Sequence, residues 1–361
     1  MILNYQQCLD KLSKIKMITI NGVPTQIKEV PELTKGLDPR VKIQRLKPKV
    51  EFSKVDDTVF EGIEIGRIRQ GMGFDNLDIS ERIIVKHEIL DGVPVRIYYP
   101  INHKGLLPAL IFIHGGGFYG GDLNVVENPC KAMAQKAHVV VVSIDYRLSP
   151  EAPFPHGLND CDTVVNYIFN HANDLGIDSN RVGISGDSAG GNLAAGCVLR
   201  DVKSLRRIKY MALLYPVVSL SEEGYQFSLD QYTFESDDEL VKRTIHSIKN
   251  CMPLINELYV RDEIPLVHPE LSPLMVEDLS QFPKTLIVSA EYDFLRLQDE
   301  AYVNRLNAAG VEVRYIQYKG MDHAFLDKCG VYPQAEDCMN EIAKDLKKLL
   351  QSRKIKIDNK Y

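Results

Sequence analysis

The sequence lacks a long apolar run, a secretion signal and a strong excess of one charge. No hydrophobic stretch approaches the roughly 20 residues that a membrane-spanning helix needs. The N-terminal residues 1–7 have neither the basic start nor the apolar run of a signal peptide. The formal net charge of -6 argues against nucleic acid or an anionic membrane as a partner. We therefore expect a soluble, cytoplasmic protein without stable membrane insertion.

Common metal and nucleotide motifs are also missing. The 7 cysteines are spread singly from Cys8 to Cys338 without a C-x-x-C pair, so no zinc site or thioredoxin-like motif is indicated. Their odd number fits free thiols in a reducing compartment. The glycine-rich residues 115–117 complete neither G-x-x-x-x-G-K-[S/T] nor G-x-G-x-x-G, which disfavours nucleotide binding.

From residue 82 onward the chain alternates between apolar runs and helix-like segments. Two β-rich runs, 83–89 and 93–99, flank Asp91-Gly92 and predict an antiparallel hairpin. The later alternation is typical of a doubly wound, mostly parallel α/β sheet covered on both faces. We expect strands at 109–113, 139–143, 182–185, 210–215, 285–290 and 311–318, and helices opening at Asn128-Pro129 and covering about 158–172, 189–202, 297–309 and 334–351.

The 361 residues allow a single α/β unit with an added cap. We expect residues 1–80 to form short helices and irregular connections with a flexible join at 71–73, serving as part of a cap or as an oligomer contact. Residues 81–218 and 283–361 would form the main domain. Residues 219–282 interrupt the alternation and are interpreted as a cap, with a helical pattern near 238–255 and an aromatic cluster of Tyr225, Phe227, Tyr232 and Phe234. A homodimer remains open.

The stretch Gly186-Asp187-Ser188-Ala189-Gly190 lies between an apolar run and a helix-like segment rich in small residues. Strand, tight turn and helix form the context of a nucleophile elbow, which exposes a serine hydroxyl at the positive end of a helix. Glycine at positions 186 and 190 removes side chains that would collide with the neighbouring strand or helix. A turn that only reverses the chain is the alternative for an isolated match.

A serine hydroxyl becomes a good nucleophile only when a base takes its proton. His323 follows the last expected strand and is the candidate base. Asp293 follows the penultimate strand and is the candidate carboxylate that orients the histidine, with a helix N-cap as the alternative. Asp322 is less suitable because it directly precedes the histidine in sequence. The chain order Ser188, Asp293, His323 is the order of α/β hydrolases.

The segment His114-Gly115-Gly116-Gly117-Phe118 directly follows the apolar run 109–113. Consecutive glycines let backbone N–H groups turn toward the oxyanion of a tetrahedral intermediate, and the amide of Ala189 would add a donor. We expect His114 to brace this loop rather than to react. Phe118 and Tyr119 are candidates for lining the substrate pocket, with packing in the core as the alternative.

These segments together resemble the hormone-sensitive-lipase-like family of carboxylesterases, which are α/β hydrolases with H-G-G-G and G-D-S-A-G signatures. The resemblance implies a serine esterase for short- to medium-chain acyl esters, without a metal or organic cofactor. It also implies that Gly116, Gly117 and Ala189 form the oxyanion hole. The matching stretches run in family order over about 82–351 and comprise 114–121, 145–151, 154–155, 186–192, 272–274, 291–294 and 320–325.

One departure from the family pattern is Phe294, where many members carry proline after the acidic residue. Two other functions would keep the same fold. An amidase or peptidase would use the same triad, whereas a ligand-binding protein would need no catalysis. The presence of His323 disfavours the second of these, because non-catalytic hormone receptors of the family lack the triad histidine.

Overall fold

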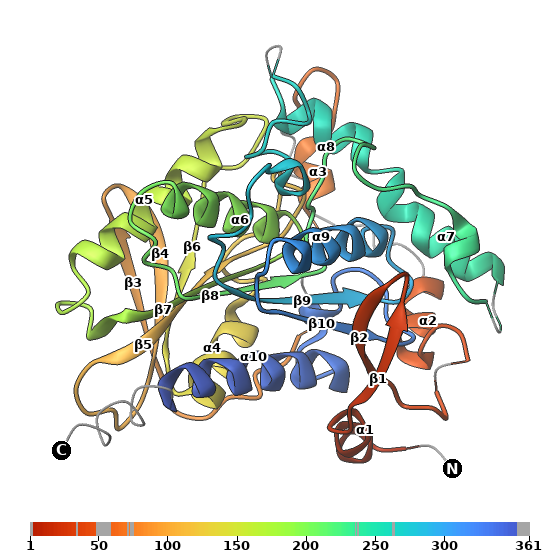
Figure 1. Ribbon diagram of the computed structural model, residues 1–361, viewed down its shortest axis with the longest axis horizontal. Coiled ribbons are helices and arrows are strands. Elements are labelled where there is room, and N and C mark those ends of the chain that lie inside the picture. Colours follow the sequence, from red (N-terminus) through yellow and green to blue (C-terminus); the bar gives the residue numbers. More distant parts are fainter. Residues whose placement is uncertain are drawn as a thin grey trace.

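A 10-stranded sheet forms the centre of the computed structural model (Figure 1). The structure describes residues 3–33, 35–47, 59–70, 72, 76–234, 236, 238–261 and 264–351. The strands are β1 (Lys16–Ile20), β2 (Val23–Lys28), β3 (Ile83–Leu90), β4 (Val93–Pro100), β5 (Leu107–Ile113), β6 (Val140–Ile144), β7 (Ile177–Asp187), β8 (Tyr210–Leu214), β9 (Lys284–Ala290) and β10 (Val313–Tyr318).

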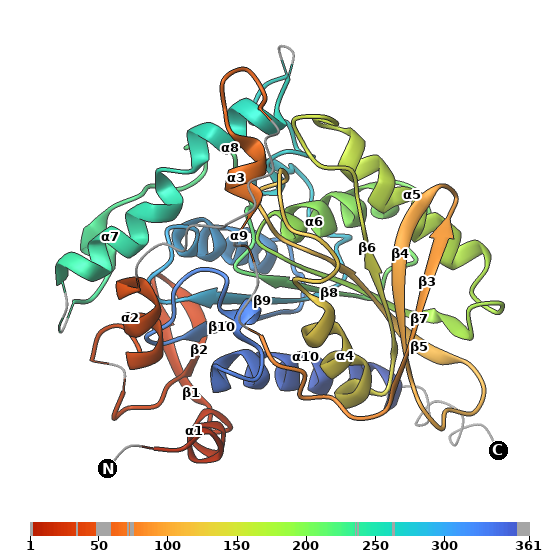
Figure 2. The ribbon, with the colours of Figure 1, turned by 180° about the vertical axis from the view of Figure 1, so that it is seen from behind.

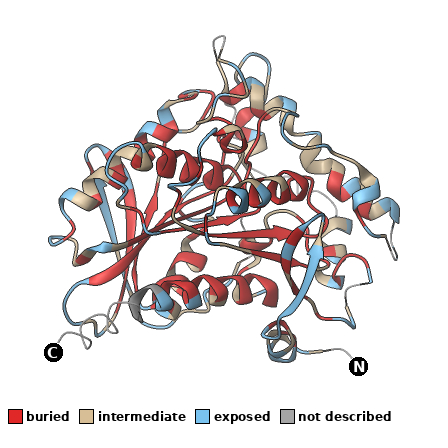
Figure 3. Cartoon of the chain, in the orientation of Figure 1, coloured by how far each residue is buried: buried red, intermediate tan, exposed pale blue. Residues whose placement is uncertain are grey.

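The strand order across the sheet is β1-β2-β10-β9-β8-β7-β5-β6-β4-β3. The seven neighbouring strands β2-β10-β9-β8-β7-β5-β6 are all parallel to one another. The remaining pairs are antiparallel: β4 with β6, β3 with β4 and β1 with β2. The central strands are buried on both faces (Figure 3), which explains their continuous apolar runs. The predicted mostly parallel α/β sheet with the antiparallel hairpin β3–β4 is confirmed.

Helices cover both faces of this sheet (Figures 1 and 2). On one face α10 packs against α4, and on the other α5 packs against α6 beside α9. Four of the five helices begin one or two residues earlier than expected from the sequence, and α6 begins as expected. Helix α4 begins at Glu127, before the expected opening at Asn128-Pro129, so Pro129 is its third residue. The bounds are α4 (Glu127–Ala137), α5 (His156–Asn170), α6 (Ala189–Val202), α9 (Arg296–Ala308) and α10 (Pro333–Gln351).

The N-terminal segment contains a hairpin that sequence analysis missed. Strands β1 and β2 join through Asn21-Gly22, both with positive φ, and β2 then pairs in parallel with β10. Asn-Gly between two extended runs is a strong hairpin signal, so the expectation of only short helices and irregular connections was wrong here. The short helices are present as α1 (Tyr5–Leu12), α2 (Pro39–Leu46) and α3 (Ile65–Arg69). The expected join includes 71 and 73, which lie outside the described residues.

The described residues of the insertion 219–282 form helices and loops without a strand. The single helix expected near 238–255 is two helices, α7 (Asp238–Lys249) and α8 (Met252–Tyr259), because the chain turns at Asn250-Cys251 and restarts with Pro253 in the first turn. Short 3₁₀ turns are η1 (Leu229–Gln231) and η2 (Pro273–Met275), and a third, η3 (Phe325–Lys328), follows β10.

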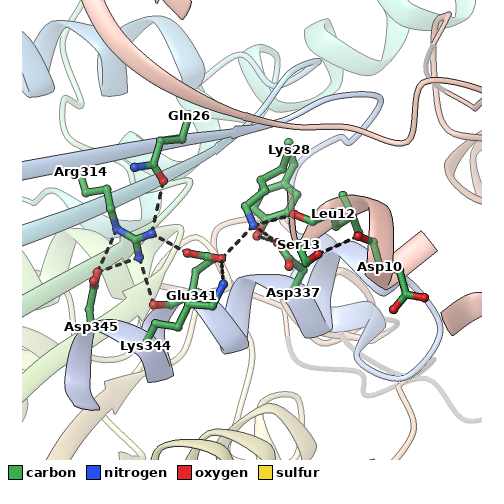
Figure 4. Close-up of polar contacts among 11 residues, drawn as sticks. Asp10, Leu12, Ser13, Gln26, Lys28, Arg314, Asp337, Glu341, Lys344 and Asp345 are labelled. Atoms are coloured by element: carbon green, nitrogen blue, oxygen red, sulfur yellow. Dashed lines mark hydrogen bonds and ion pairs between the residues drawn. The ribbon is translucent and has the colours of Figure 1, made fainter. Parts of the chain in front are cut away.

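A buried ionic network joins the N-terminal hairpin to the C-terminal helix (Figure 4). The fully buried ammonium of Lys28 on β2 lies 2.9 Å from Asp337 Oδ2 and 2.8 Å from Glu341 Oε1, and it donates to the carbonyl of Leu12 over 2.7 Å. Arg314 on β10 pairs with Glu341 as well. Burial alone would raise the pKa of Glu341, but hydrogen bonds from Lys28, Lys344 and Arg314 outweigh it and lower the pKa to about 2.

Replacing Lys28 should destabilise the fold strongly. The Lys28→Met variant leaves Asp337 and Glu341 buried without one of their cations, and breaking a buried ion pair from one side costs about 3–5 kcal/mol. Urea unfolding at neutral pH measures the loss. Lys16→Met is the matched control, because Lys16 in the same hairpin makes an exposed pair with Glu29 and should cost no more than about 1 kcal/mol. Equal losses in the two variants would contradict a structural role for the network.

Candidate active site

Ser188 lies at a sharp turn between β7 and α6. Its backbone has φ 52° and ψ -118°, an unusual conformation for a residue other than glycine. A Cβ atom on Gly186 would lie 2.3 Å from the carbonyl oxygen of Gly190, and one on Gly190 would lie 2.0 Å from that of Ile113. Only glycine fits at both positions, so the G-x-S-x-G spacing is a steric requirement of this turn.

The structure brings together the three residues predicted to carry the reaction. His323 Nε2 lies 2.9 Å from Ser188 Oγ, and His323 Nδ1 lies 2.7 Å from Asp293 Oδ2. The other oxygen of Asp293 accepts from the amide of Leu295 over 3.0 Å, in the turn before α9. Leu295 is the N-cap residue of that helix, so Asp293 is not its N-cap. Hydroxyl, imidazole and carboxylate thus form a continuous hydrogen-bonded chain, in which the ring can accept a proton from the serine.

Asp322 takes no part in the hydrogen bonds that join Ser188, His323 and Asp293. Its carboxylate accepts from Arg45 Nε over 2.6 Å instead of contacting the ring of His323. This arrangement agrees with the expectation that a residue adjacent to the histidine is poorly placed to orient it. Arg45 was not singled out by sequence analysis, because the two partners are 277 residues apart and no local motif marks the arginine.

The glycine loop after β5 presents backbone amides beside Ser188. Gly116 and Gly117 have φ values of 121° and 61°, and no described residue accepts a hydrogen bond from either amide. The amide of Gly115 donates to Asp187 Oδ1 over 2.9 Å, which ties the loop to the elbow. Ala189 is the first residue of α6, where a helical amide has no partner within the helix. The loop and the helix terminus can therefore both supply donors to an oxyanion.

His114 is completely buried at the base of this loop. Its Nδ1 lies 2.8 Å from the carbonyl oxygen of Gly115, and its ring stacks on Tyr146 with centroids 4.4 Å apart. Burial lowers the pKa of His114, which favours the neutral ring. These contacts suit the bracing role that was expected of it.

A cavity of about 400 Å³ opens over the serine. Its wall contains Ser188, His323 and the glycine loop together with apolar side chains of α7 and α8. The N-terminal segment also contributes to this wall, which sequence analysis did not foresee at the level of residues. The apolar cap residues are Ile248, Met252 and Ile255, and the N-terminal residues are Gln44, Arg45 and Met72.

The aromatic candidates divide between the cavity and the core. Tyr119 lines the cavity, whereas Phe118 stacks on Tyr259 of α8 with centroids 3.8 Å apart and is absent from the cavity wall as far as the described residues define it. The predicted aromatic cluster of the cap packs largely around Phe294 and is also outside the wall in the described part of the chain; its contacts include Tyr225–Phe294, Phe227–Phe294 and Phe227–Tyr232.

The electrostatic surroundings of His323 favour its protonated form. Burial alone would lower the pKa of the ring, but the charge and hydrogen bond of Asp293, together with Asp187 and Asp327, outweigh burial and raise it. The ring therefore becomes an imidazolium more readily than an ordinary histidine. This property suits a base that must hold the serine proton during the reaction.

No cluster of histidine, cysteine and carboxylate side chains that could hold a metal ion occurs among the described residues. Within the same part of the chain, every helix is too short or too polar to cross a membrane.

The serine at the elbow is hydrogen-bonded to a histidine, which is hydrogen-bonded to an aspartate, and both partners follow later strands of a mostly parallel sheet. This arrangement defines an α/β hydrolase of the serine type. A family model described as an α/β hydrolase fold matches residues 110–327. The chain belongs to this family, in its hormone-sensitive-lipase-like branch.

Proteins of known sequence and structure agree with this assignment. The arylesterase of Saccharolobus solfataricus is 32% identical over 70% of this chain and 79% of its own. The carboxylesterase NlhH of Mycobacterium tuberculosis is 30% identical over 85% of this chain and 96% of its own. The structure of the hyperthermophilic esterase from Pyrobaculum calidifontis superposes with a TM-score of 0.70 at 26% identity, covering 87% of this chain and 99% of the other.

The acid limb of the activity profile should lie above the range of an ordinary histidine. Because only neutral His323 can accept the serine proton, kcat/KM should fall as the pH drops through the raised pKa of the ring, above about 6.5. A kcat/KM profile from pH 5 to 9 with a neutral ester measures this limb. Asp293→Asn, which removes the largest stabilising charge, should lower kcat by up to about 10⁴-fold. A limb at or below pH 6.5 in the unaltered protein would contradict the electrostatic argument.

Proposed function

We propose that the protein hydrolyses short- to medium-chain acyl esters through an acyl-enzyme at Ser188, with His323 as the base and Asp293 as its orienting carboxylate. The observation that carries the proposal is the hydrogen-bonded chain from Ser188 Oγ through the imidazole to Asp293. Family membership makes the chain a carboxylic ester hydrolase, as its relatives named arylesterase and carboxylesterase are.

The reaction would proceed in two acyl transfers. In the first, Ser188 Oγ attacks the ester carbonyl while His323 Nε2 takes the hydroxyl proton, and the resulting imidazolium gives that proton to the leaving alcohol. In the second, water attacks the acyl-enzyme while His323 takes its proton and then returns it to Ser188. Asp293 keeps Nδ1 of the ring protonated and stabilises each imidazolium.

The oxyanion of both tetrahedral intermediates would be held by the amides of Gly116, Gly117 and Ala189. Support for these donors comes from the glycine loop, whose amides at 116 and 117 no described residue uses, and from the first amide of α6, which likewise has no acceptor among the described residues. Donors fixed before the reaction stabilise developing charge without reorganisation, and one such donor contributes about 10²–10³-fold in kcat.

Removal of the nucleophile should abolish most of the activity. Ser188→Ala should lower kcat for p-nitrophenyl butyrate by about 10⁶-fold, the scale of nucleophile loss in serine hydrolases. A fluorophosphonate probe should label the unaltered protein at Ser188 and leave the variant unlabelled.

Ser185→Ala is the matched control for this experiment. Ser185 lies three residues earlier on β7, and its buried hydroxyl has no hydrogen-bond partner among the described residues. Undiminished hydrolysis by Ser188→Ala would refute the proposal. Faster cleavage of a matched anilide than of the ester would instead assign the site to amides.

The size of the cavity supports the proposal that the acyl chain of the substrate is short to medium in length. Its volume of about 400 Å³ lies near the small end of the roughly 300–1,000 Å³ range of ligand pockets. Part of its apolar wall comes from α7 and α8, through Ile248, Met252 and Ile255. Each methylene placed against such a wall contributes up to about 0.8 kcal/mol, or about fourfold in kcat/KM.

The preference for chain length should follow this apolar wall. Along a series of p-nitrophenyl esters, kcat/KM should rise from acetate to about hexanoate and fall once the chain outgrows the cavity. Ile248→Phe narrows the cavity and should reduce the ratio of kcat/KM for the hexanoate ester to kcat/KM for the acetate ester. Ile89→Phe alters an exposed isoleucine on β3 and should leave the ratio unchanged. A ratio unaffected by Ile248→Phe would place the acyl chain elsewhere.

A further inference from the structure

The loop that carries His323 is held by backbone contacts with the N-terminal segment. The amide of Lys319 donates to the carbonyl of Lys28 over 2.9 Å, where β2 ends beside β10. The amide of Asp38 donates to the carbonyl of Gly320 over 2.9 Å, just before α2 begins. Residues far apart in sequence thus hold two successive residues of the loop that leads to the histidine.

Arg45 contacts the residue that directly precedes the catalytic histidine, Asp322. Its Nε lies 2.6 Å from Asp322 Oδ2, and the arginine also forms part of the cavity wall. Asp322 is buried, and the ionised form of a buried carboxylate is costly without a charge partner. Burial raises the pKa of Asp322 and the neighbouring guanidinium of Arg45 opposes that rise.

Helix α2 is itself fixed to the body of the protein, so Arg45 projects from a firm support. Asp38 caps the helix by accepting from the amide of Arg40 over 3.0 Å, and its other oxygen accepts from Gln334 Nε2 of α10, also over 3.0 Å. The hydroxyl of Tyr332 donates to the carbonyl of Arg40 over 3.3 Å. Figures 1 and 2 both place α2 beside the edge of the sheet where β2 and β10 lie.

The geometry points to Arg45 as a positioning residue, which acts through its ion pair with Asp322 to fix the loop that presents His323. Arg45 neither takes the proton nor contacts the hydroxyl of Ser188 in this role. It restricts the backbone one residue before the ring, and a ring displaced by about 1 Å can cost about 10²-fold in rate. The inference rests on the proposed esterase function and adds to it a residue outside the triad.

Removal of Arg45 would also change the charge around the ring. Several groups face His323 from the elements packed around it; they are Asp293, Asp187, Asp327, Asp322 and the ring of Tyr215, with Lys328 beside Asp327. An unpaired Asp322 carboxylate would favour the imidazolium further. The acid limb of kcat/KM would then move to higher pH, and replacing Asp322 by asparagine in the same protein would reverse the shift.

The test uses the full-length protein and p-nitrophenyl butyrate. We expect Arg45→Gln to lower kcat by about 10- to 100-fold with KM within about twofold of the unaltered value, because the effect is on alignment. Its acid limb should move to higher pH. In Arg45→Gln/Asp322→Asn the limb should return to or below that of the unaltered protein, while kcat stays low because the tether is still missing.

Arg207→Gln is the matched control. Arg207 also pairs with a buried aspartate, Asp201, at comparable exposure, but it lies before β8, at the end of the strands opposite to the site. It should lower thermal stability to a similar extent as Arg45→Gln without changing kcat or the acid limb. Equal losses of kcat in the two variants would overturn the inference, as would a higher KM with unchanged kcat, which would make Arg45 a substrate contact.

If Arg45→Gln does not fold, Asp322→Asn carries the test, because it breaks the same ion pair without leaving a buried charge. Its kcat should fall as for Arg45→Gln, and an unchanged kcat would overturn the inference. These outcomes differ from failure of the proposed function, in which the unaltered protein itself neither hydrolyses the ester nor reacts with the fluorophosphonate.

Discussion

Parallel pairing of β7, β8, β9 and β10 is the constraint on which the site depends. The carboxyl ends of parallel strands meet at one edge of a sheet, so the segments that follow these strands converge there. Ser188 follows β7, Asp293 follows β9 and His323 follows β10. Since each strand is buried and registered against its neighbours, the ends cannot slip without exposing core residues. The hydrogen-bonded chain through the three side chains is a consequence of this register.

The sequence allowed this part of the molecule to be predicted because each signal is local. The glycines at 186 and 190 report a close backbone approach that no other residue permits, and the position after a buried run reports the edge of the sheet. The helix over Ala189–Val202 was expected with the bounds that the structure has. Steric demands of this kind act within a few residues, so a single sequence records them.

Contacts between distant segments could not be predicted in this way. Asn21-Gly22 does signal a hairpin, but no local pattern indicates that β2 pairs in parallel with β10, and so the sheet is wider than expected. Likewise, nothing near Arg45 marks Asp322 as its partner. Phe118 shows the same limit within the glycine loop, because its sequence position next to the site did not reveal that its ring stacks on Tyr259 of α8.

The N-terminal segment is therefore joined to the rest of the protein by cation–carboxylate pairs at two places. Through Lys28 it supplies a buried cation to Asp337 and Glu341, which keeps β2 against the sheet. Through Arg45 it supplies a second cation to a carboxylate beside the catalytic ring. Both pairs replace water around acidic groups of the hydrolase domain, and a buried carboxylate is costly without such a partner. The segment is thus electrostatically coupled to the domain, and changes in it would reach His323 without any contact with the triad.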